Sequence, residues 1–599
     1  MQKEGVFMKI DLFKSGLHTD RSAQARLAKR SNLFSFLRFF LFLFIIAVAA
    51  AGYDFNQPAL YAFSAVLAAA FFRLVHAHEA LRATSLLLTK HTDVLQHYMD
   101  RFSGNWHEFP EAGTEYLSEE QPQYADLDIF GKNSIYQYIC IAQTKSGRDR
   151  LAAVMSPEPA AYSDIVCRQR AVQEFINRPT LAIELQAMLQ LLPQHHDTRP
   201  MIASCENTEE HANRFLYFTV WILPVITLLS FALAAANMIS WLSSIILLFL
   251  QFFIASLCFG RNSACLAPLF NIYRELKLYR ELFERLENIT FQSSYLNKLQ
   301  KQLLDTQASH FLRRLYHLSE CANMRYNLFF FFFANTILLW DFHCVLYFFK
   351  WRNSVGKQLR LWFDTFSEIE MLLSLAVIGQ TRELYTFPII SADESPHIEA
   401  KALTNLLLTE DAAVANNLSA LGEVHIITGS NMSGKTTFLR TLASAAILAY
   451  AGAPVCADSL TLTRMHVFTS MRVNDDITKG LSTFYAELLR IKSMVEFSQK
   501  EKPMLVCIDE IFKGTNSADR IIGAREAIKK LANPWSITIV STHDFELCEL
   551  APEIEGIPVT NYHFEEYYTN DKINFDYTIK TGRCQTTNAK YLLKLAGIL

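Results

Sequence analysis

The chain has 599 residues, of which 51% are hydrophobic and only 19% charged, and its net charge is −3. A charged fraction below the roughly 25% of soluble proteins indicates that part of the chain lies in lipid, and it excludes intrinsic disorder. The near-neutral charge gives the whole molecule no electrostatic footprint for nucleic acid, and the eleven scattered cysteines contain no CxxC pair, which excludes a zinc ribbon or a disulfide framework.

Two apolar segments near the N-terminus predict a first membrane hairpin. Residues 33–51 are interrupted only by Arg38, and residues 59–72 follow after a short polar turn. With their apolar flanks, these segments approach the roughly 20 residues that a helix needs to cross a bilayer. A signal peptide is disfavoured because about thirty residues precede the first segment and a second segment follows at once. We predict a transmembrane hairpin within residues 33–76.

A second pair of apolar segments predicts another hairpin, within residues 214–260. The pair comprises residues 215–236 and 241–259. Lys and Arg residues flank the outer ends of both hairpins, and the two connecting turns contain none. By the positive-inside rule, the basic N-terminus at residues 1–32 and all the soluble parts are therefore predicted to be cytoplasmic.

A fifth apolar segment, Leu328–Phe349, has two interpretations. It contains five consecutive phenylalanines, but also Asn335, Asp341 and His343. Because an ionisable residue in the middle of a membrane is costly, a buried helix of a soluble domain is favoured over a fifth span.

The remaining sequence predicts a linker, a helical core and an α/β domain. Residues 77–125 include a polar, acidic stretch that indicates a linker. Helical periodicity in residues 126–213 and 261–400 predicts an all-helical core that the second hairpin interrupts. Within residues 401–599 the pattern changes, from about residue 420, to short β-rich runs that alternate with helices, the signature of an α/β domain.

The clearest chemical motif is GSNMSGKT at residues 429–436, which fits the phosphate-binding pattern GxxxxGK(S/T). It lies between a predicted strand at residues 424–428 and a predicted helix at residues 437–451. The loop glycines allow backbone N–H groups to close around phosphates. Lys435 is predicted to reach the β- and γ-phosphates, and Thr436 to hold Mg²⁺.

Two acidic residues end another predicted strand, in the run MLVCIDE at residues 504–510. Asp509 is predicted to bind Mg²⁺, and Glu510 to orient or deprotonate the attacking water. His543 follows a predicted strand at residues 537–540, where it can sense the γ-phosphate. Ser482 precedes a predicted helix and has the pattern of an N-cap. In ATPases with this order of elements, that helix start also contacts the nucleotide of a partner subunit.

At these motifs the chain resembles the MutS family of DNA mismatch-repair ATPases. GSNMSGKTTFLR is similar to that family's TGPNMSGKST run, and DEIFKGTN, with Gly514 and Thr515, resembles its DE-x-x-x-GT motif. STF, STHD, NYHF near Asn561 and residues 588–598 match as well. Upstream, parts of residues 126–210 and of the segment from residue 265 resemble the two halves of the family's lever core.

The resemblance implies an α/β P-loop (ABC-type) ATPase domain preceded by an all-α lever core, and the apolar segments add two transmembrane helical hairpins to this architecture. It implies a homodimer that uses ATP and Mg²⁺ and whose hydrolysis rearranges the lever. The residues implied in nucleotide binding are Gly429, Asn431, Met432, Ser433, Gly434, Lys435, Thr436, Thr437 and Ser482. The implied metal ligands are Thr436 and Asp509, and the implied catalytic residues are Lys435, Glu510 and His543.

The family's role is mismatched-DNA binding and repair, but the resemblance does not include its mismatch-binding domain, and the second hairpin falls where the family inserts its DNA clamp. Residues 261–360 contain fourteen Lys or Arg against seven Asp or Glu. The basic residues of that segment that DNA phosphates could contact include Arg274, Lys277, Arg280, Arg313 and Arg314. We therefore predict membrane lipid as a partner, and DNA binding that is weak, salt-sensitive and without preference for mismatches.

Two alternative functions use the same ATPase. An ABC-type transporter subunit is expected to have about six grouped spans and an LSGGQ signature, whereas this sequence predicts two separated pairs and has LSTFYAE at that position. A membrane mechanochemical ATPase that acts on a protein partner fits the sequence as well as the DNA-related function does.

Overall fold

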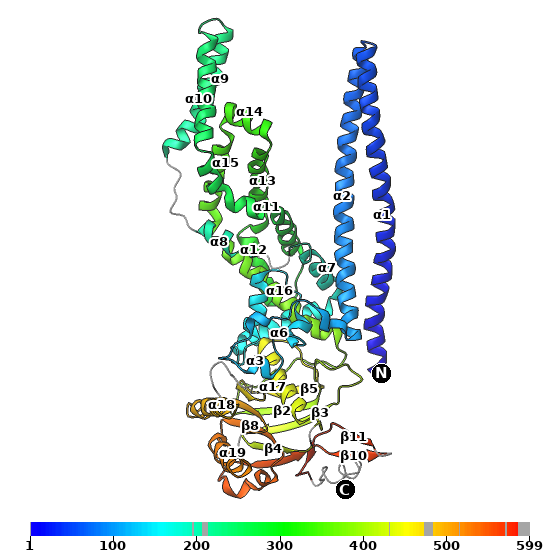
Figure 1. Cartoon of the computed structure of the whole chain (residues 1–599), viewed down its shortest axis with the longest axis vertical. Helices are drawn as coiled ribbons and strands as arrows, with labels where there is room; N and C mark the ends of the chain where they lie inside the picture. Colours follow the sequence, from blue (N-terminus) through cyan, green and yellow to red (C-terminus); the bar gives the residue numbers. More distant parts are fainter. Residues whose placement is uncertain are drawn as a thin grey trace. The chain divides into compact units, whose positions relative to one another are not determined.

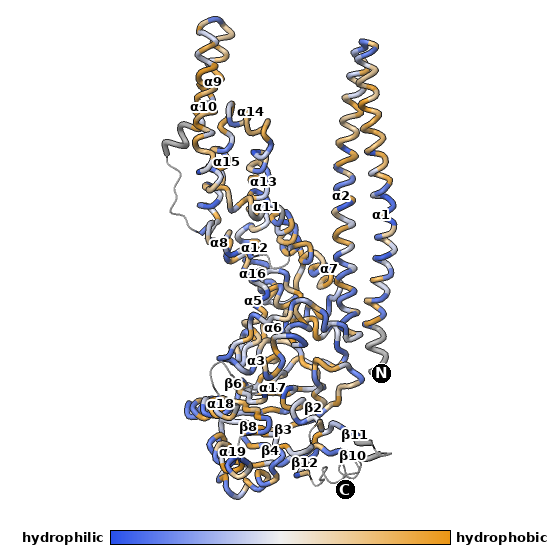
Figure 2. Tube along the Cα trace, viewed as in Figure 1, coloured by the Kyte–Doolittle hydropathy of each residue, from blue (hydrophilic) through white to orange (hydrophobic). Residues whose placement is uncertain are grey.

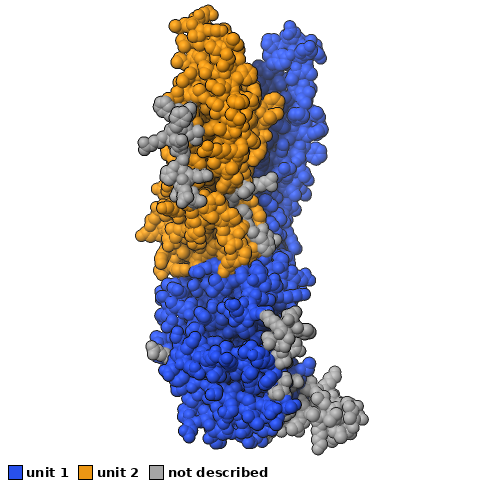
Figure 3. All heavy atoms as spheres, turned by 60° about the vertical axis from the view of Figure 1, so that its left-hand side comes forward, with its two compact units in different colours: residues 1–141, 150–184, 371–599 blue, residues 142–149, 185–370 orange. Residues whose placement is uncertain are grey.

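The computed structural model describes residues 2–193, 197–206, 214–393, 395–430, 432–472, 483–513, 516–569 and 572–584. The chain forms two compact units (Figure 3). Unit 1 comprises Met1–Ile141, Arg150–Glu184 and Met371–Leu599, and unit 2 comprises Ala142–Asp149 and Leu185–Glu370. Both predicted lever segments contribute to both units, so the units do not follow the boundaries expected at residues 126 and 261.

Unit 1 begins with a long helical hairpin, α1 (Gln2–Asp54) and α2 (Pro58–Ser103). Pro58 starts α2 and Gly104, with φ +85°, ends it, as expected for an N-terminal proline and a left-handed C-cap. The predicted linker at residues 77–125 is thus wrong as far as Ser103, and residues 1–32 belong to the same helix as the apolar segment that follows. No proline interrupts α1, and its only glycines are isolated, so the helix continues through the basic region.

Both hairpin helices are long and apolar enough to cross a membrane, by length and composition. Their apolar side chains are exposed, as at Phe40 and Val66, and Figure 2 shows them concentrated toward the turn that joins the helices. In unit 2, two bent helix pairs also pass this test if each pair is counted as one span. The described residues therefore contain two to four candidate spans.

The open end of the hairpin is anchored within unit 1. The ring of Phe13 stacks on that of Tyr98 at 4.7 Å, and the Tyr98 hydroxyl donates to Gln380 Oε1. Lys9 Nζ donates to the backbone oxygens of Gly379 (3.0 Å) and Arg382 (2.8 Å), at the end of helix α16. A cation at a helix C-terminus satisfies orphan carbonyls and is favoured by the helix dipole.

The next elements are short and lead into the lever helices. They are η1 (Asn105–Glu108), η2 (Thr114–Tyr116), α3 (Gln123–Asp126), α4 (Ile135–Ile139), α5 (Lys145–Val154), α6 (Tyr162–Asn177), α7 (Pro179–Leu189) and α8 (Arg199–Glu206).

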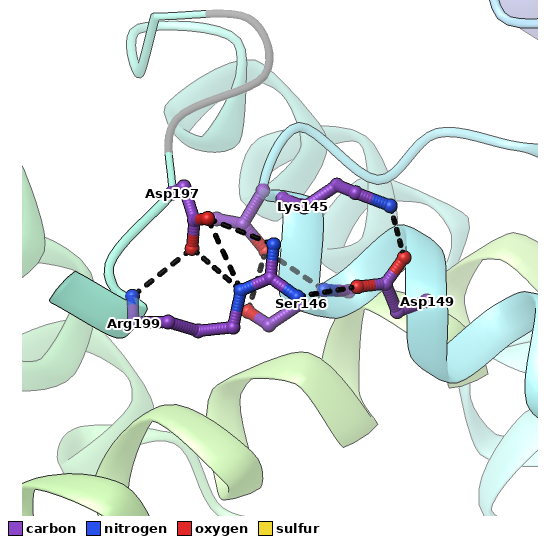
Figure 4. A network of polar contacts seen from close by, with 7 residues as sticks. Lys145, Ser146, Asp149, Asp197 and Arg199 are labelled. Carbon is purple, nitrogen blue, oxygen red and sulfur yellow. Dashed lines mark hydrogen bonds and ion pairs between the residues drawn. The ribbon is translucent and has the colours of Figure 1, made fainter. Parts of the chain in front are cut away.

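The starts of α5 and α8 are joined by a surface network (Figure 4). In it Arg199 donates to both oxygens of Asp197 and lies 3.3 Å from Asp149, which also pairs with Lys145. Because these groups are exposed, the network fixes geometry more than it adds stability.

The rest of unit 2 is helical, as the sequence predicts. Its helices are α9 (Arg214–Ala235), α10 (Trp241–Leu257), α11 (Phe259–Asn288), α12 (Ser294–Asp305), α13 (Ala308–Asn323), η3 (Met324–Tyr326), α14 (Leu328–Leu338), α15 (Trp340–Val355), η4 (Gly356–Gln358) and α16 (Leu359–Thr381), which continues into unit 1. The single buried helix expected at Leu328–Phe349 is wrong, because Leu339 adopts a left-handed φ of +52° and separates α14 from α15. Of the two, α15 is largely buried and α14 largely exposed.

A buried carboxylate in unit 2, that of Glu370, binds the start of α5. It accepts hydrogen bonds from the backbone N–H groups of Gln143 (2.9 Å) and Thr144 (3.2 Å) and from the Thr144 hydroxyl. A Cβ at Gly147 would lie 2.1 Å from Glu370 Oε2, so only glycine fits there. Burial raises the pKa of Glu370 to about 7, although these hydrogen bonds oppose the shift.

Glu370→Gln is expected to flatten the pH dependence of stability. Between about pH 4.5 and 7, folded Glu370 keeps a proton that the unfolded chain has lost, so stability falls as pH rises through this window and is then level. The full effect is up to about 3 kcal/mol. Unfolding of the solubilised chain at pH 5 and pH 8 measures it. Glu368→Gln is the matched control for the same substitution elsewhere on α16, where the carboxylate accepts from the Tyr295 hydroxyl (2.7 Å).

The C-terminal part of unit 1 is an α/β domain whose strands begin at Ile389, before the expected boundary at 401. A six-stranded sheet has the order β12-β9-β4-β8-β7-β6, in which only β12 is antiparallel. Its strands are β4 (Val424–Thr428), β6 (His466–Ser470), β7 (Met504–Asp509), β8 (Ser536–Thr542), β9 (Val559–His563) and β12 (Lys580–Thr581). The central strands β4, β7 and β8 are buried at every position, which explains the apolar run that begins β7, whereas β4 and β8 also bury polar residues such as His425 and Thr538.

A smaller sheet and three helices complete the domain. The smaller sheet, in the order β1-β5-β2-β3, contains β1 (Ile389–Ile390), β2 (His397–Leu403), β3 (Asn416–Leu421) and β5 (Ser459–Leu462), and a separate ribbon pairs β10 (Glu566–Thr569) with β11 (Lys572–Phe575). The helices are α17 (Lys435–Ala451), α18 (Thr483–Ser498) and α19 (Ser517–Leu531), with η5 (Phe545–Glu549) and η6 (Ala551–Glu553). Because β4, β7 and β8 are parallel, their carboxyl ends lie together at one end of the larger sheet, where ligands bind in open α/β folds (Figure 1).

Candidate nucleotide site

The loop between β4 and α17 has the backbone of a phosphate cradle. Gly429 (φ +150°) and Gly434 (φ +108°) adopt conformations that favour glycine, and a Cβ at Gly429 would lie 2.7 Å from the backbone oxygen of Phe564. Ser433 is 1% exposed, and its hydroxyl has no hydrogen-bond partner among the described residues. Met432 is 84% exposed. A buried hydroxyl without a partner in a glycine-rich loop before a helix N-terminus suits an anionic ligand.

Lys435 starts α17 and folds back over this loop. Its Nζ donates to the backbone oxygens of Gly429 and Ser430, at 2.8 Å each. Burial lowers the pKa of Lys435, whereas the nearby carboxylates of Glu510 and Asp509 raise it. The ammonium group therefore lies inside the loop, held by two carbonyls that it can exchange for phosphate oxygens.

Three side chains form an oxygen cluster, namely Thr436 in the first turn of α17 and Asp509 and Ser541 near the ends of β7 and β8. Thr436 Oγ1 donates to Asp509 Oδ2 at 2.8 Å, and the Ser541 hydroxyl donates to the other oxygen of Asp509. Neighbouring ligands of an octahedral Mg²⁺ with bonds of about 2.1 Å lie about 2.9 Å apart, so the Thr436–Asp509 pair fits two such positions. The described residues contain no group of three or more His, Cys, Asp or Glu side chains suited to a metal. The pair is thus a site that needs oxygens from a ligand or water.

Glu510 lies beside this cluster and pairs with His543. The distance between His543 Nε2 and Glu510 Oε1 is 2.9 Å, and Lys513 Nζ lies 3.3 Å from the other carboxylate oxygen. The hydrogen bond from His543 lowers the pKa of Glu510 to about 2, with a smaller effect of Lys513. The carboxylate is therefore negatively charged at every physiological pH, and it is held at the edge of the site.

Helix α18 is joined to the chain that follows Glu510. The carboxylate of Glu487 accepts from the backbone N–H of Phe512 at 2.5 Å, and burial raises its pKa. Ser482, predicted at the start of this helix, lies outside the described residues. Asn431, Gly514, Thr515 and residues 588–598 do so too, and the structure gives no position for them.

A pocket of about 330 Å³ opens beside the phosphate loop. Its lining includes Gly434 and Thr437 of the loop and helix, Phe438, Asn416 and Tyr577. The Asn416 side chain holds the Tyr577 segment, since it donates to the backbone oxygen of Tyr577 (3.0 Å) and accepts from the backbone N–H of Ile579 (2.7 Å). An apolar slot with few polar groups next to a phosphate cradle has the form of a base pocket.

The sequence did not point to Asn416, Tyr577 or Ser541. Asn416 and Tyr577 lie far apart in the chain and belong to no local motif, so only the fold brings them together. Ser541 could have been predicted, because it belongs to the run STHD, which contains His543 and follows the predicted strand at residues 537–540. The structure thus adds a pocket beside the phosphate loop and a hydrogen-bond partner of Asp509 to the predicted residues.

In unit 1, the carboxylate of Asp126 at the end of α3 connects this helix with β6 and α18. The carboxylate of Asp126, which is fully buried, accepts from the Thr469 hydroxyl (2.7 Å) and from the backbone N–H groups of Met471 (3.1 Å) and Arg472 (2.9 Å). Arg490 of α18 lies 3.3 Å from the same carboxylate. The start of the predicted lever is therefore bound to β6 and α18.

Asp126→Asn is expected to destabilise unit 1 by about 2–3 kcal/mol, because an amide replaces a fully buried carboxylate that accepts three hydrogen bonds and pairs with Arg490. Thermal unfolding of the solubilised chain measures the loss. Asp128→Asn is the matched control: Asp128 pairs with Arg472 and Arg440 at a partly exposed position, where the cost should stay below about 1 kcal/mol. Equal effects of the two substitutions would contradict a special role of Asp126.

Comparison with known proteins supports the identity of this domain. The family model described as MutS domain V matches residues 425–598. The chain is similar to the DNA mismatch repair protein MutS of Listeria welshimeri, with 32% identity over 238 residues that cover 39% of this chain and 27% of the relative. For the protein of the same name from Natronomonas pharaonis, the identity is 29% over 236 residues, with the same coverage. The match thus spans about a quarter of the length of these curated relatives.

These matches concern the part of the chain that contains the phosphate loop, the oxygen cluster and the Glu510–His543 pair. A MutS domain V is an ABC-type ATPase domain, and domains of this type bind ATP with Mg²⁺ and typically dimerise. The C-terminal part of this chain is therefore an ATP-hydrolysing P-loop domain of the MutS domain V type, preceded by a largely helical region.

Proposed function

We propose that the chain is a membrane-anchored MutS-like ATPase, which hydrolyses ATP as a homodimer and thereby rearranges its lever helices. The observation that carries the proposal is that the oxygen cluster and the Glu510–His543 pair lie in unit 1, the same compact unit in which Lys9 and Tyr98 anchor the α1–α2 hairpin to the end of α16. Nucleotide chemistry and a candidate membrane anchor thus belong to one compact unit.

In this proposal each side chain of the site has one task. The loop around Gly429, Met432, Ser433 and Gly434 encloses the phosphates with Asn431, and Lys435 neutralises them. The base enters the pocket between Phe438 and Tyr577, next to Thr437. Bound Mg²⁺ would polarise the γ-phosphate, and Thr436 and Asp509 would hold it.

Water activation belongs to Glu510, which accepts the proton of the attacking water or orients it while His543 keeps the carboxylate in place. Ser482 of the partner subunit completes the site from the start of α18. Both roles depend on the closing of two ATPase faces on each other.

The described residues favour this function over a transporter subunit. They provide two to four candidate spans by length and composition, fewer than the roughly six of an ABC transporter half. For DNA, we propose at most weak, salt-dependent contact without mismatch discrimination, through basic residues such as Arg313 and Arg314. A protein partner for the lever is the second candidate, because the candidate membrane spans favour a position at a membrane over one on a duplex.

Cysteine labelling in intact cells tests the membrane topology. Cysteines introduced at Asp54 and Ser240, in the two hairpin turns, are expected to react with an impermeant reagent from outside the cell. A cysteine at Glu496, exposed on α18, is the control and should react only after lysis. Labelling of the turn positions only after lysis would contradict the anchoring.

A further inference from the structure

Helix α14 of unit 2 presents its apolar residues outward and its polar residues inward. Leu328 and Phe329 are each 76% exposed and Phe333 is 58% exposed. Asn335 is fully buried, and its Oδ1 accepts from the backbone N–H of Asp341 at 3.0 Å. A contiguous exposed patch of large apolar side chains marks an interaction surface.

This helix is too short to cross a bilayer, and its two ends are held on the same side. Its 11 residues extend over about 16 Å, half of the roughly 30 Å of hydrocarbon. Arg325, just before α14, lies 3.0 Å from Asp341, just after it, and both side chains are 2% exposed. Trp340 Nε1 donates to the backbone oxygen of Cys321 at 2.9 Å. The chain thus leaves α13, runs along α14 and returns into α15.

The direction of α14 differs sharply from that of the helices it joins. The axis bends by 80° between α14 and the helical segment that follows Leu339, so α14 lies across the ends of α13 and α15 (Figure 1). Asn327 fixes the start, since its Oδ1 accepts from the backbone N–H groups of Phe329 (3.1 Å) and Phe330 (3.2 Å). Local contacts therefore define both ends of α14.

The apolar surface of α14 continues into that of the α9–α10 hairpin. The rings of Phe332 and Phe252 of α10 lie 5.1 Å apart, and those of Phe331 and Phe259, at the start of α11, lie 5.4 Å apart. Beyond these contacts the hairpin is apolar and exposed at positions such as Phe249, which is 65% exposed (Figure 2). One continuous apolar surface therefore includes a segment long enough to enter a bilayer and a segment that turns along it.

We propose that α14 is an interfacial membrane helix, whose face formed by Phe329, Phe332 and Phe333 inserts among lipid headgroups and the upper acyl chains. The proposal rests on the membrane anchoring proposed above, because the α9–α10 hairpin must enter the same bilayer. Lipid fits this apolar surface better than a second copy of the chain does, since one bilayer covers the α9–α10 hairpin and α14 together. Phe, Trp and Leu side chains form the apolar face of helices that lie at this depth of a membrane. In this position α14 fixes the height and tilt of unit 2 at the membrane surface.

Spin labels at three matched positions test the proposal in the full chain reconstituted into phosphatidylcholine–phosphatidylglycerol vesicles. Labelled cysteines replace Phe333 on α14, Phe249 on the hairpin and Leu304, which is 47% exposed on α12 and serves as the aqueous control. The four partly exposed natural cysteines, Cys167, Cys258, Cys265 and Cys321, are replaced by serine. Collision with oxygen reports lipid, and collision with a water-soluble nickel chelate reports water.

We expect the label at 333 to collide with oxygen and to lose its collisions with nickel, at a depth of about 5–10 Å below the headgroups. The label at 249 should lie deeper, and the label at 304 should collide with nickel. Nickel access at 333 with a lipid-embedded 249 would overturn the interfacial helix alone. A label at 333 that neither reagent reaches would indicate a protein cover and would overturn it as well. Nickel access at both 333 and 249 would show that the anchoring itself fails.

Discussion

Glu510→Gln is expected to keep ATP binding and to slow hydrolysis by about 10²–10⁴-fold, the range for loss of a positioned acid–base group. The amide has the size of the carboxyl and leaves the Thr436–Asp509 pair, 2.8 Å apart, untouched. What disappears is a negative charge that His543 holds at 2.9 Å and that a pKa of about 2 keeps ionised. Because that pKa lies far below neutrality, protonation of Glu510 should produce no acid limb in the rate between pH 5 and 8.

Nucleotide affinity and single-turnover phosphate release, measured on the same sample, separate the two effects. Glu549→Gln is a suitable control, since Glu549 is an exposed acid of η5 that pairs with the surface residue Arg583, at 3.6 Å. Turnover of the Glu510→Gln chain at the wild-type rate would remove Glu510 from the chemistry.

Lys435→Ala is expected to reduce ATP affinity by roughly 10–100-fold, the equivalent of about 1.5–3 kcal/mol for hydrogen bonds to a charged group. Lys435 is 4% exposed, and its Nζ lies 2.8 Å from two loop carbonyls. Alanine would leave those carbonyls without their donor and the phosphates without a counter-charge. A weaker loop and a weaker phosphate contact therefore act in the same direction.

Equilibrium titration with a fluorescent ATP analogue measures this loss. Lys529→Ala on α19 removes a lysine that pairs only with the surface acids Glu526 and Glu553, and it should not change the affinity. Wild-type affinity in the Lys435→Ala chain, with the fold intact by circular dichroism, would contradict the assignment of the loop.

The elements of the ATPase domain could be predicted because each leaves a local pattern. The run at residues 424–428 became β4 without a shift, since a strand buried on both faces is apolar at most positions, although His425 and Thr428 are buried in it as well. The loop could be predicted from its glycines, because residues 429 and 434 adopt positive φ angles that favour glycine. Local signals of this kind fix the order of the elements and the residues at the ends of strands.

Long-range contacts and helix continuity were beyond the sequence. Asn416 and Tyr577 meet only because β3 and the segment after β11 are brought together by the fold. The continuation of α2 to Ser103 was hidden by acidic residues further along the chain that suggested a linker. No glycine or proline in the sequence marks the helix break at Leu339. The break depends instead on tertiary contacts such as the ion pair between Arg325 and Asp341.

Phosphate release by the purified full chain, measured in vesicles with excess Mg²⁺ and again after chelation, tests most directly whether this is a working ATPase. We expect release that depends on Mg²⁺ and is lost in the Asp509→Asn chain, in which the partner of Thr436 and Ser541 has lost its charge. Release that persists unchanged without Mg²⁺ or in that variant would contradict an ATPase centred on this site.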